Sequence, residues 1–99
     1  MVEVYVVHLP SQEKLEKFKE TVNKIIEMAK NKKLPEGLKL KKLYFDEKNN
    51  IGLCLWEVND INKLLEAAKQ LNVDWDIKII ENPKAVSYTH LTLPTIYSV

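Results

Sequence analysis

Residues 51–58 read I-G-L-C-L-W-E-V, an apolar run with the length of one β-strand. It is the most apolar of the expected strands, so we place it at the centre of a sheet. Because successive side chains of a strand point to opposite faces, this run presents two sets of residues. One face carries Gly52, Cys54, Trp56 and Val58, and the other carries Leu53, Leu55 and Glu57.

The segments before this strand carry alternating strand and helix signals. Residues 47–50 (E-K-N-N) predict a turn, because asparagine tolerates the left-handed conformation, and residues 38–46 predict a second strand before it. Residues 15–29 place apolar side chains at three- and four-residue steps, which predicts an amphipathic helix. Ser11 is the expected cap of that helix, and residues 2–9 (V-E-V-Y-V-V-H-L) predict the first strand.

After the central strand, the chain predicts one more helix and one more strand. Asn59 or Asp60 is the expected cap of a helix with an apolar stripe over residues 61–71, and residues 75–81 predict the last strand. The order β-α-β-β-α-β, with right-handed crossovers, predicts a ferredoxin-like α+β sandwich. Two helices would then cover one face of a four-stranded antiparallel sheet with strand order 4-1-3-2. The other face has no helix to cover it, so we expect a homodimer that forms through this open sheet face.

Composition limits the classes of function. The 99 residues carry 15 basic and 14 acidic side chains, for a net charge of +1, and every basic residue is lysine. This balance provides no strong field for nucleic acid or for an anionic membrane, and the third strand lacks the basic aromatic signature of RNA-binding sheets. The single cysteine suits a reducing compartment, and the apolar start of the chain is too short for a signal peptide or a membrane span. We therefore expect a cytoplasmic protein that binds neither nucleic acid nor membranes.

Residues 86–99 differ from the rest of the chain. All charged side chains precede Ala85. Residues 86–95 (V-S-Y-T-H-L-T-L-P-T) resemble a one-frame translation of a transposon-type sequencing-library adapter. We therefore expect one native domain over residues 1–85, followed by a non-native tail to which His90 belongs. Sequencing the source DNA past codon 84 with independent chemistry tests this, and a natural continuation through the same residues would contradict it.

His8 and Cys54 are the first two candidates for metal binding or catalysis in the expected domain. His8, at the end of the first strand, is a candidate metal ligand or proton carrier, and the alternative is a polar residue at a strand end. Cys54, in the central strand, is a candidate soft metal ligand or nucleophile, and the alternative is a small core residue. Cys-x-x-Cys, His-x-x-x-His and serine-centred motifs are all absent from the sequence.

Four further side chains are candidates for ligand binding. Tyr5, Tyr44 and Trp56 are expected to line a pocket on the open face of the sheet, unless they pack across strands or fill a dimer interface. Glu57 ends the central strand and is a candidate buried acid or metal ligand, although strand-end carboxylates are usually solvated.

The stretch from Gly52 to Asp60, followed by residues 64–69, resembles a small, poorly characterised family whose third strand commonly reads C-L-Y-E-A-P. Trp56 stands where tyrosine is usual, and valine and asparagine replace the final alanine and proline. The resemblance covers roughly residues 40–81, and it implies a ferredoxin-like dimer and binding of nickel or another divalent metal. It carries over no ligand set. His8 and Cys54 are the donors that this chain offers, and a site shared across a dimer is one arrangement open to them.

Two classes of function follow from these observations. The first is a small dimeric binding module that holds a metal ion or a small ligand at the sheet face. The second is a small dimeric α/β-barrel enzyme, of monooxygenase or isomerase type, that uses His8 and Tyr44 around an apolar pocket. The second class requires His8 to face inward, so the position of this side chain discriminates between the two.

Overall fold

The computed structural model describes residues 1–81, so the expected tail, residues 86–99, lies outside the described residues. One short 3-10 helix, η1, precedes the first α-helix. The elements in chain order are β1 (Val2–Leu9), η1 (Gln12–Lys14), α1 (Leu15–Lys30), β2 (Leu38–Asp46), β3 (Ile51–Val58), α2 (Ile61–Gln70) and β4 (Asp76–Glu81). No helix of the described part is long and apolar enough to cross a membrane.

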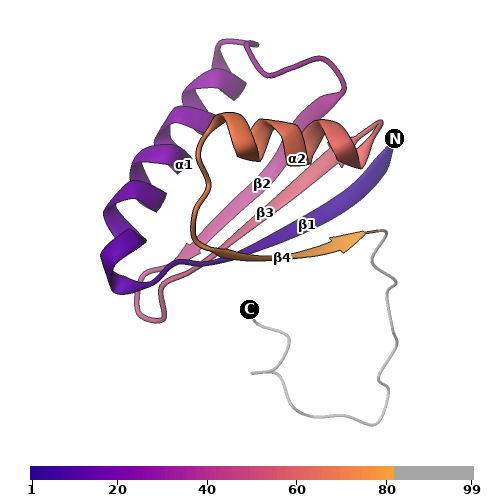
Figure 1. The fold of residues 1–99 in the computed structure, drawn as a ribbon. Helices are drawn as coiled ribbons and strands as arrows, with labels where there is room; N and C mark the ends of the chain where they lie inside the picture. The colour runs from indigo at the N-terminus through magenta and orange to yellow at the C-terminus, as the bar shows by residue number, and fades with distance from the viewer. Residues whose placement is uncertain (82–99) are drawn as a thin grey trace, which may run out of the picture.

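The strands form one antiparallel sheet in the order β2-β3-β1-β4, which is the predicted order 4-1-3-2 read from the other edge. Both helices lie on the same face of this sheet, as Figure 1 shows. The ferredoxin-like α+β fold predicted from the sequence is therefore confirmed. β1 and β3 are the central strands, and β2 and β4 are its edges.

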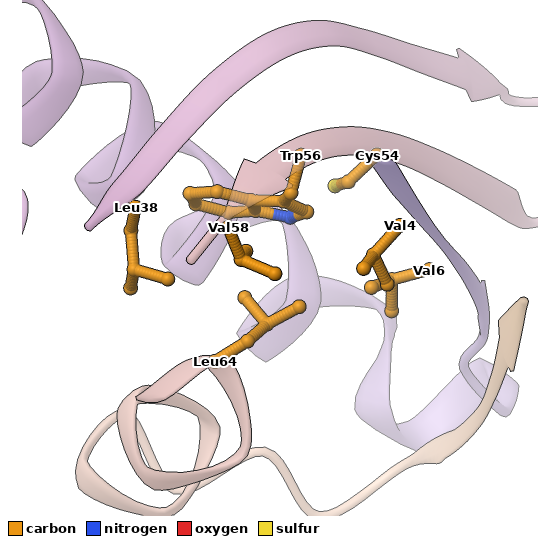
Figure 2. Packing of buried hydrophobic residues seen from close by; sticks show 7 residues of the cluster. All are labelled: Val4, Val6, Leu38, Cys54, Trp56, Val58 and Leu64. Atoms are coloured by element: carbon orange, nitrogen blue, oxygen red, sulfur yellow. The ribbon is translucent and has the colours of Figure 1, made fainter. Parts of the chain in front are cut away.

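The helix-covered face of the sheet holds the core. Every second residue of β1 and β3 contributes to it, and Leu64 of α2 packs against this layer (Figure 2). The core cluster consists of Val4, Val6, Leu38, Cys54, Trp56, Val58 and Leu64. The two faces predicted for the central strand are thus confirmed. The expectation that Trp56 lies on the open face was wrong, because Trp56 shares its side of β3 with Cys54 and is only 5% exposed.

Helix α1 approaches the sheet through Phe18, which is 1% exposed. Its ring lies directly over Gly52, where an added Cβ atom would come within 2.4 Å of the Phe18 Cζ atom. The ring also contacts Trp75 edge-on and Phe45 at an inclined angle, with centroids 5.5 Å away in each case. The absence of a side chain at Gly52 therefore sets how closely α1 packs on the sheet.

The ends of the two helices differ from each other. Asp60 caps α2 as predicted, since its carboxylate accepts a hydrogen bond from the Asn62 backbone N–H at 2.9 Å. The expectation that Ser11 caps the first long helix was wrong, because Ser11 precedes η1, makes no side-chain cap bond there, and α1 begins only at Leu15. The predicted turn before β3 is confirmed, with Asn50 in the left-handed region at φ 54°.

Candidate functional site

A cavity of about 110 Å³ lies between the two helices and the helix-covered face of the sheet. Small residues of α2, Ala67 and Ala68, line it, and their short side chains leave this space unfilled. Ile25 and Met28 of α1 line it on another side. No Asp, Glu, Lys or Arg side chain is part of its wall. The polar side chains of the wall are His8, Cys54, Trp56 and Gln70.

His8 lies near the end of β1 and is 8% exposed. The Trp75 indole Nε1 donates a hydrogen bond to His8 Nδ1 at 3.0 Å. Because an indole N–H can only donate, Nδ1 must be the acceptor in this bond. A neutral imidazole then carries its hydrogen on Nε2. The contact with Trp75 therefore fixes the tautomer of His8.

The other ring nitrogen of His8 faces Cys54. Nε2 lies 3.4 Å from Cys54 Sγ, within the limits for a hydrogen bond to sulfur. Since Nε2 carries the hydrogen, it donates and the sulfur accepts. The result is a buried chain of hydrogen bonds from Trp75 through His8 to Cys54. The structure thus brings together the two residues, His8 and Cys54, that the sequence singled out separately.

Burial keeps both groups uncharged at neutral pH. Desolvation lowers the pKa of His8 to about 4 and raises the pKa of Cys54 to about 12. A cysteine nucleophile needs a thiolate, and a histidine that activates it must accept the thiol proton. Here Nε2 already carries a hydrogen and the thiol stays protonated. This arrangement is therefore not that of a cysteine–histidine catalytic pair.

The metal expectation rested on His8 and Cys54, with Glu57 as a further candidate. His8 and Cys54 supply one nitrogen and one sulfur donor, whereas protein metal sites for zinc use three or four protein ligands. Within residues 1–81, no group of three or more His, Cys, Asp or Glu side chains is placed to hold a metal ion. The described residues of one chain therefore do not by themselves fit a nickel site.

Glu57 lies on the open face, on the side of β3 opposite Cys54. Its carboxylate pairs with Lys41, whose Nζ lies 3.1 Å from Glu57 Oε1. The hydrogen bond from Lys41 lowers the pKa of Glu57. Glu57 is thus an ionised, partly exposed carboxylate, so the solvated alternative holds for this strand-end residue and the buried acid does not.

The two candidate tyrosines, Tyr5 and Tyr44, lie away from the cavity. Tyr5 and Tyr44 belong to the open face, and Tyr44 is 55% exposed. The sheet therefore separates Tyr44 from His8, which faces the helices. The inward orientation that an enzyme requires of His8 is present, but the predicted pairing of His8 with Tyr44 was wrong. Side chains of β2 alternate between the two faces of the sheet, and the irregularity at residues 40–42 shifts this alternation by one residue. Beyond it, Tyr44 pairs with Leu53 and therefore lies on the open face.

Trp75 is the residue of this site that the sequence analysis missed. It was assigned only to the start of the last strand, although a buried tryptophan usually finds a partner for its N–H group. Trp75 is 7% exposed and precedes β4. Its neighbour Asp74 pairs with Lys14 of η1 and Lys17 of α1, whose Nζ atoms lie 2.8 Å and 3.1 Å from its carboxylate. These exposed contacts help to hold the connection that carries the indole.

Comparison with known proteins places the fold. No family model matches the chain, and no curated protein matches it. Among solved structures, it is similar to the crystal structure of an antibiotic biosynthesis monooxygenase, with 17% identity, a TM-score of 0.58, and coverage of 88% of this chain and 100% of that one. It is also similar to Rv0793 from Mycobacterium tuberculosis, with 9% identity, a TM-score of 0.56, and coverage of 89% and 97% of the two chains. At these identities, the likeness shows a shared fold.

Proposed function

We propose that this chain is a binding module for a small, uncharged and largely apolar molecule, which it holds in the cavity between α1, α2 and the sheet. The observation that carries the proposal is the cavity itself, whose wall is apolar apart from a few neutral polar groups. Pockets that bind small molecules typically combine apolar walls with a few placed polar groups. His8 and Cys54 supply such groups at the sheet side.

The size of the cavity limits the ligand. An engineered apolar protein cavity of about 150 Å³ binds benzene. The cavity described here is about 110 Å³, so the compound that fits it is benzene-sized or smaller unless the helices separate. A charged ligand would lose its hydration without gaining an ionic partner, because no ionised side chain lines the wall.

Filling the cavity should weaken binding strongly. We expect Ala68→Leu to weaken binding of benzene to the full chain by at least about tenfold, because the added carbon atoms occupy the space of the ligand. Benzene binding is measured by chemical-shift changes of the methyl groups around the cavity. Glu66→Leu adds the same side chain to an exposed position of α2 and should leave binding intact. Equal binding by both variants would show that benzene does not enter this cavity.

A second candidate function is a monooxygenase that acts on a molecule held in the same cavity. It is supported by the fold shared with a structure described as an antibiotic biosynthesis monooxygenase and by the position of His8 in the cavity wall. In this version His8 acts without Tyr44. Oxygen uptake that depends on a bound compound and is lost in His8→Gln would favour the enzyme, and binding without turnover would favour the module.

The open face of the sheet supports the proposal of a homodimer. Its central rows carry apolar side chains, and pairing of this face with a second copy would bury them. These residues are Tyr5, Val7 and Leu53 of the central strands, with Ile80 of the edge strand β4 beside them, whereas Leu55 of the same face is already buried within one chain. Light scattering of the full chain should therefore give twice the chain mass.

A charge in the centre of that face should separate the two copies. We expect Leu53→Lys to give a monomer, because each copy would bury an unpaired lysine charge in the interface. Glu66→Lys introduces the same side chain on the exposed surface of α2 and should remain dimeric. A wild-type chain that is monomeric at high concentration contradicts the proposal.

A further inference from the structure

We infer that the cavity selects molecules that carry a hydrogen-bond acceptor and no donor, such as small ketones, aldehydes or aromatic nitrogen heterocycles, and that Trp75 sets this preference through His8. The inference rests on the proposed function and names its ligand class. It is drawn from the direction of each hydrogen bond around the cavity.

Trp75 determines which His8 nitrogen carries the hydrogen. Its indole N–H donates a hydrogen bond to His8 Nδ1 at 3.0 Å. Because His8 is neutral at physiological pH, its single ring hydrogen on nitrogen must then be on Nε2. Nε2 is the nitrogen on the Cys54 side, and His8 and Cys54 both line the cavity. The group that His8 can offer to a ligand beside Cys54 is therefore a donor. Trp75 is not itself part of the wall, so it acts as a positioning residue.

The other buried polar groups of the wall also offer hydrogen-bond donors. Cys54 Sγ already accepts the hydrogen bond from His8 Nε2, which lies 3.4 Å away. The S–H group of Cys54 is then left as a weak donor. Trp56 is buried in the wall and has only an N–H to offer. Gln70, which has both a donor and an acceptor, lies at the exposed end of α2. The polar hydrogens that His8, Cys54 and Trp56 carry are therefore the hydrogen-bonding groups available to a ligand at the buried part of the wall.

A wall that offers donors discriminates between ligands of equal shape by their hydrogen-bonding groups. Sulfur is a weak acceptor, so a ligand oxygen or ring nitrogen that replaces it as the partner of Nε2–H makes a stronger hydrogen bond. A ligand O–H or N–H would be buried in the cavity without an acceptor, which disfavours alcohols and amines. The site should therefore prefer the acceptor among otherwise similar compounds.

Pyridine and benzene test the inference, because they have nearly the same shape and differ by one acceptor nitrogen. Their affinities for the full chain are measured by NMR titration at about pH 8, where pyridine is uncharged. We expect the pyridine-to-benzene affinity ratio of the wild type to exceed that of Trp75→Phe by about fivefold, the size of one net hydrogen bond. His8→Leu removes the donor itself and should lower the ratio equally, which keeps the test valid if Trp75→Phe does not fold.

Two further measurements separate positioning from packing. Nitrogen-15 spectra of wild-type His8 should show Nδ1 as an unprotonated acceptor and Nε2 as a protonated nitrogen, and Trp75→Phe should change this pattern. Phe45→Leu disturbs the same aromatic cluster through Phe18 but makes no bond to His8, so it should retain the wild-type ratio.

Each outcome has a distinct meaning. If neither benzene nor pyridine binds the wild type, the proposed function fails. If benzene binds and the ratio is the same in the wild type, Trp75→Phe and His8→Leu, the proposed function stands and the inference of acceptor selection is overturned. A wild-type spectrum with the hydrogen on Nδ1 would also overturn it.

Discussion

Truncation of Phe18 to alanine should lower the free energy of unfolding by about 3–5 kcal/mol, the usual cost of removing a buried phenylalanine ring. Phe18 is 1% exposed, and its ring joins α1 to the sheet through contacts with His8, Phe45 and Trp75. A domain of this size is stabilised by about 5–15 kcal/mol in total, so the variant should be close to unfolding. Urea denaturation followed by tryptophan fluorescence measures the change.

The opposing residue, Gly52, gives this prediction a control. Gly52→Ala should cost about 1–3 kcal/mol, because the new Cβ atom would lie 2.4 Å from the Phe18 Cζ atom and the ring must move. In Gly52→Ala combined with Phe18→Leu, the smaller side chain makes room for the methyl group. The double variant should therefore be more stable than the sum of the two single changes predicts. Strict additivity would show that the two residues do not determine each other's packing.

Acidification should destabilise the domain through His8 before the carboxylates begin to titrate. Burial lowers the His8 pKa from 6.5 to about 4 in the folded state, so the unfolded chain binds this proton more readily. Stability therefore falls as the pH decreases through 6.5, and the loss is complete near pH 4. Between pH 7.5 and pH 5 we expect a decrease of about 2 kcal/mol in the free energy of unfolding. Urea denaturation over this pH range measures it.

The His8→Gln variant isolates this effect. A glutamine amide can accept from Trp75 and donate to Cys54, but it does not titrate. Its stability should vary less between pH 7.5 and pH 5 than that of the wild type, and the difference between the two proteins reports His8 because His90 is present in both. Parallel pH profiles would mean that His8 titrates normally in the folded protein.

The fold was predictable from the sequence because its signals are local. Apolar residues at three- and four-residue steps mark both helices, and the run at residues 51–58 marks the central strand. The alternation of side chains along that strand also placed Cys54 and Trp56 together on one face. The pocket expected on the open face included Trp56, although the alternation put Trp56 on the opposite face. The structure buries Trp56 beside Cys54, as the alternation predicted.

The candidate site was predictable only in part, because its contacts are tertiary. His8 and Cys54 were recognised by their chemistry, but the direction of their hydrogen bonds depends on Trp75, which is distant in sequence. The cavity arises from what Ala67 and Ala68 leave empty between two helices, and no local pattern records the separation of the helices. Tyr44 and Glu57 lie on the open face, as the alternation predicted, and only the grouping of Tyr44 with His8 in one site failed, because His8 faces the helices.

The hydrogen bond between Trp75 and His8 joins residues 67 positions apart, and the contact between Cys54 and His8 spans 46 positions. On the ribosome, β1, α1, β2 and β3 are therefore synthesised well before the indole that completes the chain of bonds. A nascent domain that collapsed at that stage would enclose an imidazole nitrogen without its donor, which disfavours early closure. The order of synthesis thus links completion of the site to docking of the last strand, so that a chain interrupted before Trp75 cannot assemble it.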